Sequence, residues 1–325
     1  MDYTFTDTKI ENFTDFTEEI IDTLKTHYGP GAKIKTHSIT KNNGVVYTGL
    51  TVNKNRKEVL SPIIYLEPYF DDYNAGRNFN DIVECIIKQR EDNSIINDFD
   101  PSIIMDFDKI EHNICVKLVN AELNKELLAN VPHKRIKDLA AIFYILAYTK
   151  EDGNGTITIT KEMMGKWRYN IKIKELYKLA LENTQRLFPG KINDMGYMIN
   201  KISGFAPNVD DLEVEYAGPS FNIYKEVDAE LNPLYVVTNV ANVSGACVLL
   251  YDELLKTFAK KIDGNFYILP SSIHEVLFVP EKANVNKEEL KDMVCSVNQE
   301  VVDTRDFLSD NVYYYDMDTD SLSVV

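Results

Sequence analysis

The sequence lacks any long apolar run and contains little glycine or proline. No stretch approaches the roughly 18–20 uninterrupted apolar residues that a membrane-spanning helix needs. The first residues, MDYTFTDTKIENF, carry neither the basic start nor the apolar segment of a signal peptide. With 14 glycines and 11 prolines among 325 residues, collagen-like and low-complexity classes are excluded. We therefore expect a soluble, cytoplasmic protein of about two domains, or three small ones, without membrane contact.

Cysteine is also scarce, and its spacing excludes the common metal and disulfide patterns. Cys85, Cys115, Cys247 and Cys295 lie far apart, and no two form a CxxC or CxxH pair. Each lies within an apolar run, which favours buried free thiols. The glycine-rich loops GxGxxG and GxxxxGKS/T are missing as well. The sequence thus predicts no metal site and no cofactor.

The chain is acidic, and its charge is unevenly distributed. The formal net charge is −16. Residues 66–112, 205–232 and 281–325 carry 12, 7 and 11 carboxylates against 4, 1 and 4 Lys/Arg, whereas residues 113–204 carry 15 Lys/Arg against 9 carboxylates. Direct DNA binding is not expected, because binding to phosphates relies on concentrated Lys/Arg. The asymmetry indicates either a solubilising surface with subdomains docked on one another, or an acidic face for a protein partner with a basic surface.

Hydrophobic periodicity predicts an N-terminal α-β-β-β-α unit over residues 1–112. Asn43-Gly44 is a strong hairpin signal between two alternating runs, and Gly29-Pro30 ends the first helix. The predicted elements are a helix over 13–27, strands over 32–40, 44–53 and 61–66, and a helix over 79–92.

A middle α+β unit is predicted over residues 113–204, followed by an acidic connection over 205–232 with one strand in it. The middle unit is predicted to contain strands over 114–120, 138–149 and 155–160 and helices over 121–129, 161–167, 173–184 and 189–202.

The C-terminal unit, residues 233–325, is predicted to be a ββαββ arrangement with one more helix and an acidic tail. LYVVTN and GACVLLY are expected to pair as a hairpin, and the tail around Asp316, Asp318 and Asp320 to be disordered. The predicted elements are strands over 234–239, 245–251, 265–272, 274–280 and 312–315 and helices over 252–262 and 287–301. Because hairpins dominate, we expect an α+β fold with mainly antiparallel sheets and packed helices.

Several stretches resemble a bacterial family called domain of unknown function 5688. In chain order they include IYLEPYFDDYNAG, KLVNAELNKELLANVPHKRIKDLA, YVVTNVANVSGACVLLY and NFYILPSSIHEVLFVP. The resemblance extends from about residue 45 to 315 and keeps the family's order. The resemblance implies a cytoplasmic protein of anaerobic gut bacteria. It implies no particular activity and carries over no catalytic residue.

The stretch Ser271-Ser272-Ile273-His274-Glu275 is the best candidate for chemistry. Nucleophilic catalysis needs a hydroxyl, a base within hydrogen-bond reach and a group that orients the base. Ser271 or Ser272 with His274 and Glu275 supplies these types. On a strand, however, His274 and Glu275 point to opposite faces. The favoured interpretation is a tight turn whose hydroxyls satisfy backbone groups, and ligand binding and catalysis stay open as alternatives.

Thr238 and Asn239 end the strand that should lie near this stretch. Polar side chains at strand ends can bind a ligand, although an asparagine in a turn more often bonds to the backbone. They are weak candidates for ligand binding.

These patterns favour a non-enzymatic interaction or accessory protein, since the sequence has no nucleotide loop, no metal-ligand spacing and no convincing triad. Two alternatives stay open. One is a hydrolase-like enzyme that uses the region from Ser271 to Glu275. The other is an acidic mimic, from a mobile element, that blocks a nucleic-acid-binding partner.

Overall fold

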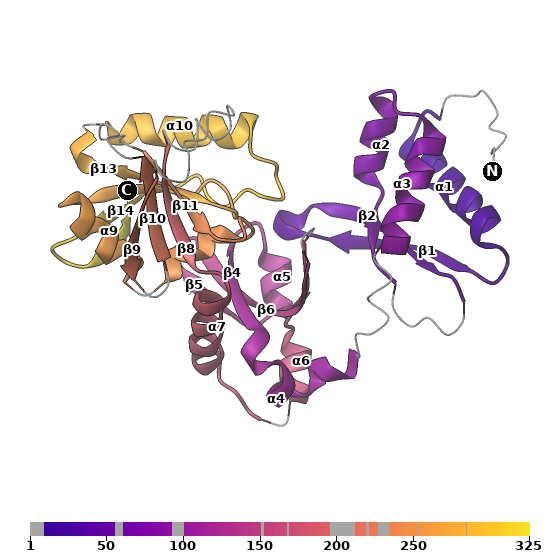
Figure 1. Ribbon diagram of the computed structural model, residues 1–325, viewed down its shortest axis with the longest axis horizontal. Coiled ribbons are helices and arrows are strands. Elements are labelled where there is room, and N and C mark those ends of the chain that lie inside the picture. Colours follow the sequence, from indigo (N-terminus) through magenta and orange to yellow (C-terminus); the bar gives the residue numbers. More distant parts are fainter. Residues whose placement is uncertain are drawn as a thin grey trace. The chain divides into compact units, whose positions relative to one another are not determined.

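The computed structural model describes residues 10–55, 61–92, 101–150, 153–167, 169–195, 212–218, 221–226, 234–251, 253–283 and 285–325 (Figure 1). The chain divides into two compact units, Met1–Pro101 and Ser102–Val325. Both units combine helices with sheets whose strands are mainly antiparallel, so the predicted α+β class is confirmed. The finer division at residues 112, 204 and 232 stays a prediction.

The first unit is built on a sheet of order β1-β2-β3. Its helices and strands are α1 (Phe13–Tyr28), β1 (Lys33–Thr40), β2 (Val46–Asn53), β3 (Ile64–Tyr65), α2 (Glu67–Asn74) and α3 (Phe79–Asp92). The side chain of Asn12 caps α1 by accepting a hydrogen bond from the backbone N–H of Asp15, and Gly29 ends the helix with φ 77°. Asn43 and Gly44 both adopt positive φ in the β1–β2 hairpin, as its sequence predicts.

The core of this unit lies between its helices and one face of the sheet. Figure 1 shows α1, α2 and α3 on the same side of the β1–β2 hairpin. α1 and α3 contribute apolar stripes at helical spacing, and alternate residues of the strands meet them. The buried side chains are Phe16, Ile20, Leu24, Leu50, Val52, Ile64, Leu66, Phe79, Ile82, Val83 and Ile86.

The second unit contains two sheets. One has the order β4-β6-β5 with β7 beside β6, and the other has the order β15-β14-β12-β13-β11-β8-β10-β9. All their pairings are antiparallel except β8 with β10. The strands are β4 (Ile114–Asn120), β5 (His133–Ile136), β6 (Leu139–Lys150), β7 (Gly153–Thr158), β8 (Gly190–Asp194), β9 (Leu212–Gly218), β10 (Phe221–Glu226), β11 (Tyr235–Asn239), β12 (Phe266–Leu269), β13 (Val276–Pro280), β14 (Tyr313–Asp316) and β15 (Ser321–Val324).

Helices cover both faces of the larger sheet. α9 packs Phe258 against Phe266 and Phe278, whereas α10 packs against the alternate residues Tyr267 and Val279. The described helices of the unit include α4 (Phe107–Ile110), the 3-10 turn η4 (Glu111–Asn113), α5 (Lys125–Asn130), α6 (Lys161–Lys166), α7 (Ile173–Leu187), the 3-10 helix η6 (Gly245–Leu250), α9 (Leu254–Ile262) and α10 (Lys287–Glu300). One large core joins the two sheets through α7, η6 and α9.

The predicted ββαββ arrangement is wrong at its second strand. GACVLL forms the 3-10 helix η6, and β11 pairs with β13 and β8 instead of with this segment. Ala246, Cys247 and Val248 are all buried, so an apolar run of this length fits a buried strand and a buried helical turn equally well. The other strands and the helix of this arrangement are present.

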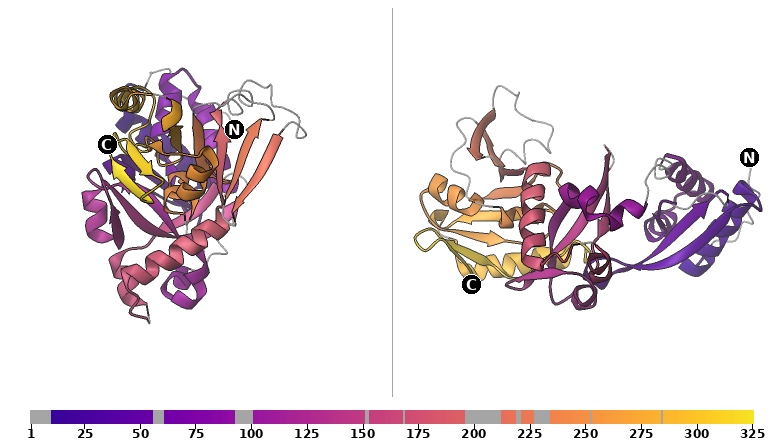
Figure 2. Two further views of the ribbon diagram at one scale, coloured as in Figure 1. Left: turned by 90° about the vertical axis from the view of Figure 1, so that its left-hand side faces the viewer. Right: turned by 90° about the horizontal axis from the view of Figure 1, so that it is seen from below.

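Three further predictions need correction. The range 189–202 was predicted to be helical, yet Gly190–Asp194 is strand β8, and residues 196–202 lie outside the described residues. The segment 205–232 holds two strands, β9 and β10, where one was expected. The acidic tail is ordered, because β14 and β15 form a hairpin in which the Asp316 carboxylate accepts from the N–H of Thr319 at 2.9 Å. Figure 2 shows this hairpin in yellow.

Phe258 offers a direct test of the packing between α9 and the sheet. It is 1% exposed, and its ring centroid lies 5.1, 4.9 and 5.0 Å from those of Tyr235, Phe266 and Phe278. Phe258→Ala should lower the free energy of unfolding by about 3–5 kcal/mol, as large core truncations do. Lys256→Ala on the same helix removes a partly exposed ion pair and should cost less than about 1 kcal/mol. Equal urea midpoints for the two variants would contradict this packing.

Candidate functional site

The structure brings most of the predicted site residues together in one place. Thr238 and Asn239 end β11, and Ser272 and His274 lie in the segment that leads into β13. The Thr238 hydroxyl donates a hydrogen bond of 2.7 Å to the carbonyl oxygen of His274. We call the contacts among residues 238–246, 271–275 and 306–308 the strand-end junction.

The predicted nucleophiles are engaged by the backbone. The Oγ of Ser272 accepts a hydrogen bond of 3.0 Å from the N–H of His274, and Ser272 is buried. Its backbone forms a bridge with Phe307, and the carbonyl of Ser271 accepts from the N–H of Leu308 at 2.9 Å. This is the geometry of a serine turn, in which the hydroxyl serves a neighbouring backbone group.

Both ring nitrogens of His274 have partners. Nδ1 lies 3.3 Å from the backbone nitrogen of Ser244, which donates to it. Because Nδ1 accepts this hydrogen bond, the proton of the neutral ring is on Nε2, which lies 3.3 Å from Oδ1 of Asp306. The carboxylate that reaches the ring is therefore Asp306, from a loop more than thirty residues away, while Glu275 lies half-buried at the start of β13.

Asn239 pins the loop that follows β11. Its Nδ2 donates to the carbonyl of Val243 and its Oδ1 accepts from the N–H of Ala241, both at 3.0 Å. Asn242 and Ser244 adopt left-handed φ values of 53° and 51°, a conformation that needs such support in non-glycine residues. The loop 240–244 is thus held in one shape, and it presents the half-exposed side chains of Val240 and Val243 (50% and 51%).

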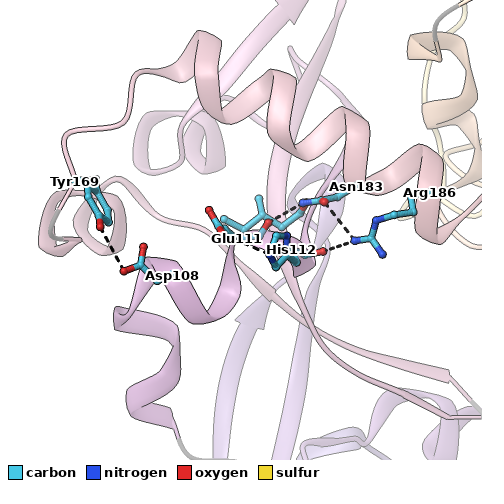
Figure 3. A network of polar contacts seen from close by, with 7 residues as sticks. Asp108, Glu111, His112, Tyr169, Asn183 and Arg186 are labelled. Carbon is cyan, nitrogen blue, oxygen red and sulfur yellow. Dashed lines mark hydrogen bonds and ion pairs between the residues drawn. The ribbon is translucent and has the colours of Figure 1, made fainter.

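A second polar cluster ties α7 to the turn before β4, and Figure 3 shows it. Asn183 donates through Nδ2 to the carbonyls of Glu111 and Ile114, at 2.7 and 3.0 Å. Arg186 donates to the carbonyl of His112 at 2.7 Å and to Oδ1 of Asn183 at 3.3 Å. Since these acceptors are mainly backbone carbonyls, the cluster holds the backbone of η4 against α7, and we assign it a structural role. No sequence pattern pointed to it, because the partners that it joins are 69 to 74 residues apart in the chain.

Asn183 should therefore matter for stability. Asn183→Ala removes the side-chain donor from one buried carbonyl, of Ile114, and one part-buried carbonyl, of Glu111, which should lower the free energy of unfolding by about 1–3 kcal/mol. The neighbouring Glu182→Ala removes a long, exposed ion pair with Lys178 and should change it by less than about 0.5 kcal/mol. Urea denaturation of both variants checks this, and an unchanged midpoint for Asn183→Ala would show that these hydrogen bonds do not stabilise the fold.

Two buried thiols, of Cys115 and Cys247, and two tyrosines, Tyr144 and Tyr251, form a third cluster in the core of the second unit. Cys247 Sγ lies 3.8 Å from the hydroxyl of Tyr251, which donates to the carbonyl of Phe188 at 2.6 Å. Burial raises the pKa of the Cys115 thiol to about 11 and that of Cys247 to about 12. Both thiols stay protonated near neutral pH, so they are poor nucleophiles. The prediction of buried free thiols is confirmed for these two cysteines.

The raised pKa of Cys247 predicts a loss of stability at alkaline pH. Unfolding exposes the thiol, whose pKa then falls to about 8.5, so above that pH the unfolded state releases a proton that the folded state keeps. Between pH 7 and pH 10 the wild-type protein should lose about 2 kcal/mol more unfolding free energy than Cys247→Ala. Cys295→Ala, which removes a half-exposed thiol, should follow the wild type. Equal losses in urea titrations of all three proteins would contradict the prediction.

Within the described ranges, no group of three or more His, Cys, Asp or Glu side chains is placed to hold a metal ion. No helix there is long and apolar enough to cross a membrane.

Comparison with known proteins identifies the family of the chain. None of the curated proteins matches it, and none of the solved structures does. One family model, described as a family of unknown function (DUF5688), matches residues 13–317. The match covers most of the 325 residues and confirms the resemblance seen in the sequence. The chain belongs to the family called domain of unknown function 5688.

Proposed function

We propose that this protein is a non-enzymatic accessory protein that binds a partner protein through the loop 240–244. The observation that carries the proposal is that hydrogen bonds fix the backbone of this loop while two of its apolar side chains are exposed. The strand-end junction fixes its backbone through Asn239 and His274, and Val240 and Val243 project from it half-exposed. Side chains that are ordered before binding lose little entropy when they become an interface, so such a loop suits recognition.

The charge around the loop favours a partner with a basic surface. Asp306 and Ser244 lie at opposite edges of the His274 ring. Asp303 lies three residues before Asp306 on the same turn, where its carbonyl accepts from the N–H of Asp306. Arg305 approaches both carboxylates, at 3.4 and 3.7 Å, which leaves two negative charges against one positive. A net-negative cluster beside the His274 ring is complementary to a basic protein surface, and it would speed association at low salt.

A hydrolase-like enzyme is the second candidate. The His274–Asp306 pair favours it, because an acid that orients a histidine is a recurring part of catalytic triads. Against it, His274 Nδ1 already accepts the N–H of Ser244, so this hydrogen bond would have to break before that nitrogen could take a proton from a serine. The acidic mimic has less support, since the acidic stretch 66–112 lies mostly in the first compact unit, whereas 205–232 and 281–325 belong to the second.

Position-specific photo-crosslinking in cells tests the proposal. A photoreactive residue at Val243 should give a discrete adduct with a basic protein, whereas one at Val324, 42% exposed at the end of β15, should not. With the isolated partner, Val240→Asp should weaken binding about fivefold or more, as the loss of an interface anchor does. Affinity should also fall as salt is raised.

Two outcomes would contradict the proposal. One is equal adduct yield at Val243 and Val324. The other is turnover of an ester, amide or phosphoester that disappears in both Ser272→Ala and His274→Ala but persists in Val240→Asp, which would instead support the hydrolase alternative.

A further inference from the structure

The sheet of the first unit has one face that its helices do not cover. Ile34, Leu50 and Ile64 point into the core beside α1 and α3. Their neighbours along each strand therefore point the other way. We call this second surface the open face; its residues are Lys33, Lys35, His37 and Ile39 on β1, Tyr47, Gly49 and Thr51 on β2, and Ile63 and Tyr65 at β3.

Contacts between side chains confirm that these residues share the open face. His37 Nε2 lies 3.1 Å from Oγ1 of Thr51. A Cβ added at Gly49 would lie 2.5 Å from the Ile39 side chain and 2.6 Å from that of Ile63, so the glycine lets the two isoleucines close over it. Ile63 is nevertheless 44% exposed.

Aromatic rings and cations meet on the open face. The rings of Tyr47 and Tyr65 lie 5.6 Å apart in an edge-on arrangement, and both are partly exposed. Lys41 Nζ sits 4.1 Å from the centroid of the Tyr65 ring. Lys33 and Lys35 are exposed along the β1 edge, followed by His37.

The first unit separates its charges. Residues 29–53 contain three lysines, Lys33, Lys35 and Lys41, and no Asp or Glu, within a chain of net charge −16. Helices α1, α2 and α3 carry eleven carboxylates on the other side of the sheet. The charge of the whole chain argues against phosphate binding, but the open face carries cations with no carboxylate from its own three strands.

We propose that the open face binds single-stranded nucleic acid. Lysines at alternate strand positions are about 6.6 Å apart, roughly twice the 3.4 Å rise of a stacked strand, which suits an extended chain of phosphates. The partly exposed rings of Tyr47 and Tyr65, the second with Lys41 over one side, are surfaces on which unstacked bases can lie. An acidic polypeptide would use the lysines but would leave the two rings without a role, and this favours a nucleic acid as the occupant.

Fluorescence anisotropy with the full chain and labelled oligouridylate or oligothymidylate of about 12 nucleotides tests the proposal. Binding is expected with a dissociation constant of about 10⁻⁴–10⁻⁶ M. The logarithm of affinity should fall with the logarithm of salt with a slope near −2, from Lys33, Lys35 and Lys41 at about −0.7 each. Comparing the two oligonucleotides shows whether the 2′-hydroxyl matters.

Matched variants separate this site from non-specific attraction. Lys33→Gln/Lys35→Gln should reduce the salt slope by about 1.4, whereas Lys25→Gln/Lys88→Gln, on the helices of the same unit, should leave it unchanged. Tyr47→Ala should weaken binding about fivefold or more, and Tyr47→Phe, which keeps the ring, should bind as the wild type does. Thermal melting of each variant verifies that it folds.

Three outcomes would overturn the proposal. One is no anisotropy change up to about 10⁻⁴ M protein at low salt. Another is an equal loss of affinity in the two lysine pairs. The third is displacement of the oligonucleotide by polyglutamate of similar length as effectively as by unlabelled oligonucleotide, with Tyr47→Ala silent, which would identify an acidic polypeptide as the occupant.

Discussion

The close approach of Gly245 to the end of β11 is the constraint on which the strand-end junction depends. A Cβ at this position would lie 2.0 Å from Oγ1 of Thr238 and 2.3 Å from the carbonyl oxygen of His274. The second atom belongs to the backbone, so a larger residue would have to move a strand end and not just a flexible side chain. Because glycine has no side chain, the start of η6 can pack directly against the end of β11 while the Thr238 hydroxyl donates a hydrogen bond to the carbonyl of His274. The ring of His274 is then fixed between Ser244 and Asp306.

The same junction explains how distant segments form one sheet. β11 lies between β13 and β8, which are far from each other in sequence. Loop closure over such separations costs conformational entropy, and it must be offset by buried contacts. The large core offsets it, because it contains residues from both sheets, α7, η6 and α9, with Phe258 among three other rings. The junction and this core therefore stabilise each other, and the loop 240–244 is ordered as a consequence.

Local patterns in the sequence predict most elements but only part of the candidate site. The helix at 13–28 and the Asn43-Gly44 hairpin follow from spacing and turn chemistry that involve near neighbours only. Gly245–Leu250 does not, because a short buried run carries no period that separates strand from helix. Residue types indicated His274 and Thr238, yet the partner of His274 is Asp306, and nothing in one sequence links positions 32 residues apart. Its tertiary contact decides what the histidine can do.

The net charge of the chain is also a poor predictor of binding, but the charge of each face can be worked out from the sequence. A net charge of −16 describes the whole chain and hides the face on which each charge lies. On β1 Lys33, Lys35 and His37 recur at every second residue, so the period of the strand alone assigns the two lysines and the histidine to one side. On α1 the carboxylates follow a helical period that keeps them away from the buried stripe of Phe16, Ile20 and Leu24. Since each element sorts its own charges by its own period, opposite potentials can develop on two sides of one small unit. Charge is therefore informative about partners when it is counted by face, and the net charge of the chain is a poor guide to them.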